Sequence, residues 1–304
     1  MKKLFLFLTL LSGINSANAC SVCGCSASNQ YLGILPNSKS NFAGIQYQYR
    51  EFQSTHETIE GATPEVSKDY YHTAQVWGRY SLLRNLQLFA FVPYVYNERV
   101  ENGVYSRNAG LGDVTILANY RILGANCTGK EWQHNLLAGG GVKLPTGKYD
   151  RNNIKYNEGL PNIQPGTASF DFILNTNYTL QRNNTGINAD VSYVVTTPNK
   201  DQYKFGNRLS AGLLMFHNFA AGQLKLIPQA GARYERNELD YSNYYYSVEN
   251  AYSGGSQLFA SAGLQAFRSN IGAQAMLHIP LSQNYSDGMV QSKYKTELGI
   301  YFLF

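Results

Sequence analysis

The sequence predicts an all-β protein, a twelve-stranded antiparallel transmembrane β-barrel, and three features of the chain indicate this fold. Polar and apolar residues alternate with period two over most of the length, as they do in strands with two different surroundings. Only 15% of the 304 residues are charged, against about 25% in a typical soluble protein, while Tyr (24) and Gly (28) are abundant. The connections between the alternating segments also fall into a short set and a long set.

The clearest strand is the last one, residues 292–304. Tyr294 and Leu298 fall on one face of it, and Lys293 and Glu297 fall on the other. Each alternating segment has about 11–15 residues, and a tilted strand needs about 9–11 to cross a bilayer. The eleven earlier segments are residues 41–52, 71–81, 86–98, 112–122, 133–145, 168–180, 186–197, 203–216, 222–236, 256–267 and 270–281.

One of these segments, residues 86–98, departs from the pattern, because Phe89, Phe91 and Val95 make both of its faces apolar.

The joins between segments are sorted by length. Five are short or moderate, and they alternate with joins that are mostly long and polar. Short turns at one rim and long loops at the other are typical of outer-membrane barrels, in which the short side is periplasmic. An even number of strands then places both termini on the periplasmic side. The short joins are 82–85, 123–132, 181–185, 217–221 and 268–269, and the long ones are 53–70, 99–111, 146–167, 237–255 and 282–292, with 198–202 brief.

The N-terminus has the pattern of a secretory signal. Lys2 and Lys3 precede an apolar stretch, which ends in small residues at Ala17-Asn-Ala19. We therefore predict a cleaved signal peptide at 1–19, a Cys-rich periplasmic segment at 20–40 and the barrel at 41–304. Residues 20–40 could fold into the bore as a plug, because they contain the apolar run 31–36. Lipidation of Cys20 is an alternative, although the residues before it lack the Leu that a lipoprotein signal has.

Charge and hydropathy exclude some classes of protein. The formal net charge of +5 includes the two lysines of the signal, so the mature charge is too small to favour nucleic acid as a partner. After the signal no apolar run approaches the ~18 residues of a transmembrane helix. The mature chain therefore enters a membrane only as strands, and the expected location is the outer membrane of a Gram-negative cell, with outer-membrane lipid as its surroundings.

The alternation places many ionisable residues on the inner face. Basic groups outnumber acidic ones there, and opposite charges could pair across a narrow bore. A polar interior suits either a water-filled path or a closed, salt-bridged plug, and both readings stay open. The residues predicted to line the lumen are Arg50, Arg79, Asp113, Arg121, Lys143, Asp171, Asp190, Arg208, Lys225, Arg233, His278 and Glu297.

The cysteines form a second candidate site. Cys20, Cys23 and Cys25 make a C-x-x-C-x-C motif at the predicted mature N-terminus, and Cys127 lies in a turn on the same side. Closely spaced thiolates suit Cu(I) or Zn(II). In an oxidising envelope the same residues could form disulfides instead, including one that ties the segment to the rim. Catalysis has little support, since no G-x-S-x-G motif is present, and we expect no enzyme.

Several strings at the strand ends resemble a known family. They are Gly110-Leu-Gly-Asp113, Gly141-Val-Lys-Leu-Pro-Thr-Gly-Lys-Tyr149, Gln164-Pro-Gly-Thr167 with Asp171, and Tyr203-Lys-Phe-Gly-Asn207. Together they look like the outer-membrane transporter family named for a MetA pathway of phenol degradation, which is distantly similar to the FadL-type channels for hydrophobic compounds. The C-terminal aromatic residue Phe304 resembles the one that the insertion machinery reads in such barrels. The cysteine motif resembles a Bacteroidetes-type subset of the family.

The resemblance implies a channel or transporter for a small solute, and the analogy with the FadL-type channels implies a hydrophobic one. Two alternatives remain from the residues themselves. One is a metal-handling envelope protein that uses the cysteine motif, and the other is an accessory barrel that binds a periplasmic protein partner through residues 20–40.

Overall fold

The structure is a computed structural model, and it describes residues 23–27, 30–35, 41–56, 65–124, 132–150, 161–250 and 253–304. Within these ranges no helix is long and apolar enough to cross a membrane. Twelve long strands form the wall. They are β3 (Phe42–His56), β4 (Glu65–Ser81), β5 (Leu86–Glu101), β7 (Thr115–Leu123), β8 (Trp132–Lys143), β9 (Asp171–Arg182), β10 (Thr185–Thr196), β11 (Arg208–His217), β13 (Leu224–Asn237), β16 (Gly255–Arg268), β17 (Ile271–Tyr285) and β18 (Val290–Leu303).

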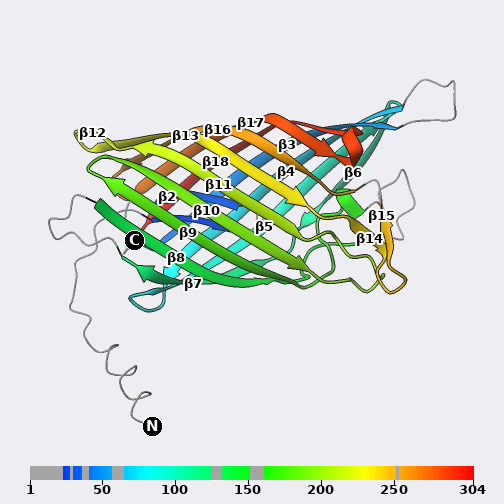
Figure 1. Cartoon of the computed structure of the whole chain (residues 1–304), viewed down its shortest axis with the longest axis horizontal. Helices are drawn as coiled ribbons and strands as arrows, with labels where there is room; N and C mark the ends of the chain where they lie inside the picture. The colour runs from blue at the N-terminus through cyan, green and yellow to red at the C-terminus, as the bar shows by residue number, and fades with distance from the viewer. Residues whose placement is uncertain are drawn as a thin grey trace, which may run out of the picture.

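Each of these strands pairs antiparallel with its neighbours in chain order, and β18 pairs with β3 to close the ring (Figure 1). At the closing seam Asn41 and Phe304 exchange two backbone hydrogen bonds, of 3.0 and 2.9 Å. Closure leaves no unpaired sheet edge, which a strand protein in lipid requires. The predicted twelve-stranded antiparallel barrel is confirmed.

Several predicted boundaries differ from the structure. The predicted loop 53–70 is shorter, because β3 continues to His56 and β4 begins at Glu65. Residues 99–111, expected as a polar loop, are mostly strand, because β5 continues to Glu101 and pairs with β6 (Val104–Leu111). The polar residues of this hairpin bond across it, as in the 2.6 Å Arg107–Glu98 ion pair. Residues 203–207, expected as strand, lie in a loop that bridges through Lys204 to Tyr241.

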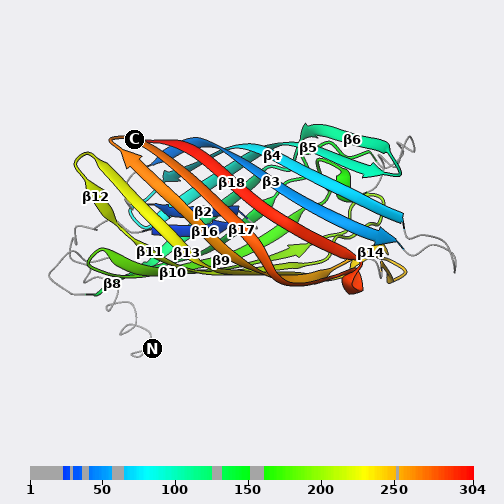
Figure 2. The same cartoon turned by 90° about the horizontal axis from the view of Figure 1, so that it is seen from above.

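The connections separate into two rims, as predicted (Figures 1 and 2). We call the end with the turns at 82–85, 183–184 and 269–270, near which the C-terminus also lies, the short-turn rim. The opposite end is the long-loop rim. Besides the β5–β6 hairpin, it carries β14 (Asp240–Asn243), β15 (Val248–Asn250) and the short 3-10 turns η2 (Pro161–Ile163) and η3 (Ser286–Gly288), while β12 (Phe219–Ala221) belongs to the short-turn rim.

The polarity of the two faces of the wall is the reverse of that in a soluble protein, because the exposed outer face is apolar and the buried inner face is mostly polar. Outward positions carry exposed apolar side chains, such as Ile45, Leu174 and Ile300, each more than 60% exposed. Inward positions are mostly polar and buried, such as Gln46 and Asn188. An exposed apolar face of this extent needs lipid around it.

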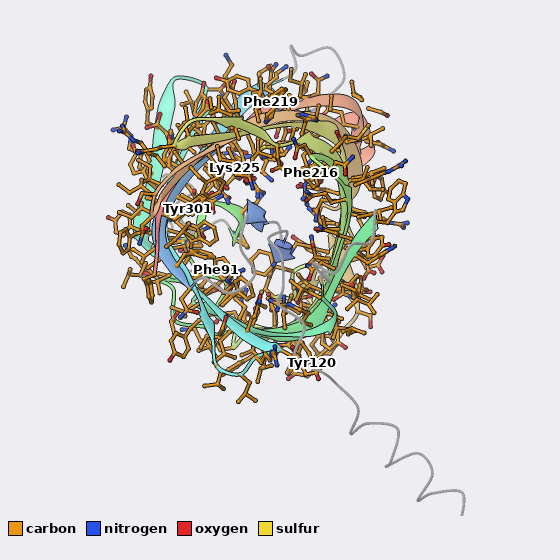
Figure 3. The ribbon with its side chains drawn as sticks, turned by 90° about the vertical axis from the view of Figure 1, so that its left-hand side faces the viewer. Phe91, Tyr120, Phe216, Phe219, Lys225 and Tyr301 are labelled. Carbon is orange, nitrogen blue, oxygen red and sulfur yellow. The ribbon has the colours of Figure 1, made fainter. Side chains whose placement is uncertain are left out.

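The backbone of a short hairpin lies inside the barrel (Figure 3). It consists of β1 (Cys23–Ala27) and β2 (Gln30–Leu35), which pair antiparallel, and β1 lies against β9 and β10.

Candidate functional site in the bore

The middle of the bore is lined by paired charges. Arg233 on β13 donates from Nη2 to both carboxylate oxygens of Asp190 on β10, each at 3.1 Å, and from Nη1 to Ser210 at 2.6 Å. Both partners of the ion pair are almost fully buried. A bidentate arginine–carboxylate pair compensates the cost of removing both charges from water.

A second group of charged side chains adjoins the first on the inner face, because Glu235 lies two residues after Arg233 on β13. Lys295 contacts Glu235 at 3.4 Å and Glu297 at 3.0 Å, and His278 Nε2 lies 3.7 Å from Glu297. The other ring nitrogen of His278 hydrogen-bonds with Ser261 at 2.7 Å. The imidazole is therefore held by a hydrogen bond at Nδ1, while Nε2 faces Glu297 without forming one.

The ion pair between Asp190 and Arg233 passes over Gly212, and this gives a first testable prediction. Gly212 lies on β11 between the strands of Asp190 and Arg233, and an added Cβ would be 2.6 Å from Asp190 Oδ1 and 3.0 Å from Arg233 Nη2. Gly212→Ala should disturb this pair and destabilise the barrel by about 1–3 kcal/mol, measured by urea unfolding in lipid vesicles. The control is Gly124→Ala, whose added Cβ would lie at an ordinary contact distance of 3.5 Å from Arg121, and it should unfold like wild type. An equal loss of stability in both variants would contradict the prediction.

A third cluster joins the long loops to the inner wall. Lys143 Nζ lies 3.2 Å from Asp113 and 2.7 Å from Asp171, and Arg208 lies 3.7 Å from Asp171. Lys143 also donates to Thr167, whose backbone N–H and hydroxyl donate to Asp113 at 2.9 and 2.7 Å. We call Asp113, Lys143, Thr167, Asp171 and Arg208 the rim tie. It fixes the loop between β8 and β9 at the mouth.

The loop held by the rim tie turns inward over the mouth. Ile163 of η2 is buried, and its carbonyl accepts a hydrogen bond of 3.1 Å from Asn97 on β5. Gly147 donates its N–H to Asp113 at 2.9 Å, and its backbone packs closely against Gly166. The long-loop rim is thereby narrowed by its own chain.

The remaining predicted lumen residues also lie on the inner face. Arg79 and Arg121 are buried, and the Arg79 guanidinium lies 5.4 Å from the centre of the Phe42 ring. Arg50 and Lys225 are partly buried. The structure thus distributes the twelve predicted residues among three clusters and a few separate positions.

The cysteine site lies largely outside the described residues. Cys20 and Cys127 are in ranges that the structure does not describe, and for Cys23 and Cys25 only the backbone of β1 is given. Among the described side chains no group of three or more His, Cys, Asp or Glu is arranged to hold a metal ion. Metal binding and disulfide formation at these cysteines stay predictions.

An apolar collar inside the bore is the feature that sequence reasoning missed. Its members are buried on the inner face of every wall strand except β17. In Figure 3, which looks into the barrel from the short-turn rim, Phe91 and Phe216 lie inside the wall and Tyr120 lies outside it. The collar consists of Phe42, Trp77, Phe89, Phe91, Leu117, Leu137, Ile173, Val194, Phe216, Ile227, Phe267 and Tyr301.

The aromatic side chains of the collar lie along the wall. The Tyr301 ring lies over Gly272, where an added Cβ would be 2.6 Å from its Cζ, and the Phe216 ring lies over Gly186. Glycine at these two positions leaves room for a neighbouring ring on the strand surface. The rings thus form a packed apolar layer on the inner side of the wall.

The wall itself is interrupted between β17 and β18. Their ladder stops after His278–Lys295 and resumes only at Tyr285–Val290, and β17 contains Pro280, which has no N–H to donate. The Gln283 side chain accepts the Ser292 N–H at 2.7 Å in place of a backbone carbonyl. A pocket of about 570 Å³ lies at this gap, lined by Leu277, Ile279, Pro280, Gln283, Ser292, Lys293 and Tyr294.

A family model described as "Putative MetA-pathway of phenol degradation" matches residues 52–272, well over half of the chain. The chain belongs to this family. The strings that predicted the resemblance all fall within the match, and three of them meet at the rim tie through Asp113, Lys143 and Thr167. The family pattern in these strings therefore has a structural basis. The cysteine motif lies outside the matched residues, so the subset that it suggests stays a prediction.

One solved structure in the comparison shares the fold of this family member, and two further matches have lower TM-scores. An outer-membrane channel from Pseudomonas putida F1 matches with a TM-score of 0.62 and 12% identity, over 87% of this chain and 95% of that one. The β domain of the Bordetella autotransporter BrkA gives a TM-score of 0.46 at 12% identity, over 86% and 99%. The monoaromatic hydrocarbon channel CymD gives 0.41 at 8% identity, over 87% and 88%. A search of curated protein sequences found no match.

Proposed function

We propose that this outer-membrane barrel is a channel for small apolar molecules of about the size of a single aromatic ring. The observation that carries the proposal is the apolar collar inside the bore. A path for ions or sugars needs polar groups along its whole length, because a dry apolar section is a barrier to hydrated solutes. An apolar solute is instead stabilised in such a section, since it leaves water there.

The charged part of the bore is compatible with an apolar solute. The main acidic side chains there are already paired, as in Asp190–Arg233 and Glu297–Lys295, so they do not need counter-ions from the solution. The family membership supports transport of small hydrophobic compounds, and the fold supports the outer membrane as the location. We infer no catalytic role, and we expect the short-turn rim, with both termini, to face the periplasm.

We propose that the solute first binds at the collar and then leaves through the gap between β17 and β18, which lies on the long-loop side of Tyr301. An apolar solute in the bore gains little by entering water at the periplasmic rim, and the gap opens toward the membrane. Its pocket is lined mainly by apolar groups of Leu277, Ile279 and Pro280. We propose that β1 and β2 form part of a plug in the bore, which limits leakage of polar solutes.

The collar can be tested with a charge. Phe91→Asp places a carboxylate in a fully buried apolar position, which raises the barrier for an apolar solute. Uptake of p-xylene should fall about tenfold or more, because each 1.4 kcal/mol added to a barrier slows passage about tenfold. Uptake is measured as the oxidation of p-xylene by intact Gram-negative cells that contain a cytoplasmic aromatic oxygenase. Intact cells are needed because their lipopolysaccharide slows the passage of apolar compounds, whereas a simple liposome bilayer lets these compounds through without a channel.

The matched control is Phe91→Leu, which keeps the site apolar and should retain most of the uptake. Heat-shifted gel mobility shows whether each variant is folded. Unchanged uptake in a folded Phe91→Asp barrel would show that the solute does not pass the collar, and would overturn the proposed function.

A further inference from the structure

Two polar groups inside the apolar collar have no hydrogen-bond partner among the residues that the structure describes. They are the indole Nε1 of Trp77 and the hydroxyl of Tyr301, and each side chain is only 1% exposed. Buried donors are nearly always paired, because an unpaired one keeps the full cost of leaving water. A phenylalanine at either position would avoid this cost, so the donors need a reason other than packing.

The two donors belong to one nest of aromatic rings. The ring centroids of Trp77 and Tyr301 are 5.9 Å apart, and Phe42 lies 4.4 Å from Trp77 and 5.8 Å from Tyr301. Phe91 stacks parallel to Trp77 at 6.4 Å, and Phe267 lies 5.6 Å from Tyr301. The donors are therefore surrounded by flat apolar faces within the bore.

The closing seam of the barrel brings these residues together. Tyr301 on β18 is the register partner of Gly44 on β3, which is in turn the partner of Trp77 on β4. An added Cβ at Gly44 would be 2.6 Å from the Cβ of Tyr301. Glycine between them allows the two large side chains to approach each other over the β3 backbone.

The chemistry of the nest defines what would satisfy it. An indole N–H can only donate, and a phenol hydroxyl donates readily, so both groups need an acceptor. The surrounding rings favour a flat aromatic molecule through offset or edge-to-face contacts. A plain hydrocarbon can contact these rings but leaves both donors unpaired, whereas an aromatic molecule with a phenol, ether or carbonyl oxygen can pair with at least one of them.

We propose that Trp77 and Tyr301 form a recognition site for aromatic molecules that carry an oxygen acceptor. The site makes the channel select oxygenated aromatics over hydrocarbons of the same size. This inference rests on the proposed function and specifies its substrate class. Discrimination through a hydrogen bond is strong when the alternative solute leaves a buried donor unsatisfied.

The chain contains two tryptophans, which allows a direct binding test. Trp132 lies exposed at the short-turn rim, beside Arg182, so Trp132→Phe leaves Trp77 as the single indole fluorophore. Purified full-length Trp132→Phe protein is titrated with p-cresol, 4-methylanisole and p-xylene, which have similar size. We expect the two oxygenated probes to change Trp77 emission at about three- to tenfold lower concentration than p-xylene, the range that one hydrogen bond provides.

Adding Tyr301→Phe to this variant should raise the dissociation constant for p-cresol severalfold and leave that for p-xylene unchanged. Tyr120→Phe, which removes a hydroxyl from the exposed outer face, should change neither. If Tyr301→Phe does not fold, Trp77→Phe is tested in intact cells that are given p-cresol and p-xylene together. Wild-type protein should take up p-cresol in preference to p-xylene, and Trp77→Phe should lose this preference.

Two results would overturn the inference in different ways. Equal affinity for p-cresol and p-xylene in the Trp132→Phe protein would rule out the recognition site, but it would not contradict the proposed channel for apolar solutes. An equal loss of affinity for p-cresol and for p-xylene in Tyr301→Phe would show that the hydroxyl has only a structural role. If none of the three probes binds and p-xylene uptake is also absent, the proposed function itself fails.

Discussion

A disulfide across the gap between β17 and β18 is expected to stop the uptake of p-xylene, and reduction is expected to restore it. Gln283 and Ser292 would be register partners if the ladder at Tyr285–Val290 continued inward. The Gln283 side chain already reaches the Ser292 N–H at 2.7 Å, so a closing movement of the two strands brings cysteines at these positions within the span of a disulfide. Gln283→Cys with Ser292→Cys, in a background with the native cysteines replaced by serine, should therefore hold the wall closed.

The effect should be a fall of uptake nearly to that of cells without the protein, because the proposed route has no second exit for an apolar solute. The background variant alone shows what loss of the native cysteines does. The matched control joins Leu264 and Ala275, which are register partners in the continuous β16–β17 ladder and face outward. Uptake at the wild-type rate with the Gln283–Ser292 disulfide formed would contradict exit through this gap.

Lys143→Met is expected to cause the largest loss of stability. The ammonium group lies between Asp113 and Asp171, at 3.2 and 2.7 Å, and its removal leaves two buried carboxylates facing each other. Breaking a buried ion pair from one side typically costs about 3–5 kcal/mol. The loss should appear in the urea unfolding midpoint in lipid vesicles, and the loop between β8 and β9 should become sensitive to added protease.

A charge-matched rescue separates electrostatics from packing. Adding Asp113→Asn and Asp171→Asn to Lys143→Met should recover part of the lost stability, because the two carboxylates that lost the ammonium between them are then neutral. Lys200→Met, at an exposed loop position, should unfold like wild type. A triple variant less stable than Lys143→Met alone would contradict an electrostatic origin of the effect.

The sequence predicted the fold well because strand alternation is a local property. Residues 292–304 were predicted as one alternating strand, and the structure gives β18 at Val290–Leu303 with the predicted faces from Lys295 onward. The prediction was wrong for Lys293, because a register shift between Ser292 and Lys295 places it beside the outward-facing Tyr294. Loop lengths are equally local, so the two rims were visible before the structure. The β5–β6 hairpin was missed because its polar residues, such as Glu98 and Arg107, resemble a loop until their pairing partner is known.

The candidate site was less accessible to sequence reasoning, because it depends on which residues meet across the wall. Phe89 and Phe91 broke the alternation of one strand, and that irregularity was the available sign of the collar. Trp77 and Tyr301 are separated by more than two hundred positions and meet only through the closing seam. Pro280 inside a strand was a sign of the wall gap, but the register of β17 and β18 was needed to locate it.

The most direct measurement of the central claim compares an apolar and a polar solute in the same wild-type protein. Uptake of p-xylene is measured in intact cells, with and without the protein, and arabinose permeation is measured by swelling of proteoliposomes that contain the folded barrel. The account predicts a clear increase in p-xylene uptake and arabinose permeation close to that of empty liposomes. Rapid arabinose permeation with no increase in p-xylene uptake would contradict it and identify a water-filled pore.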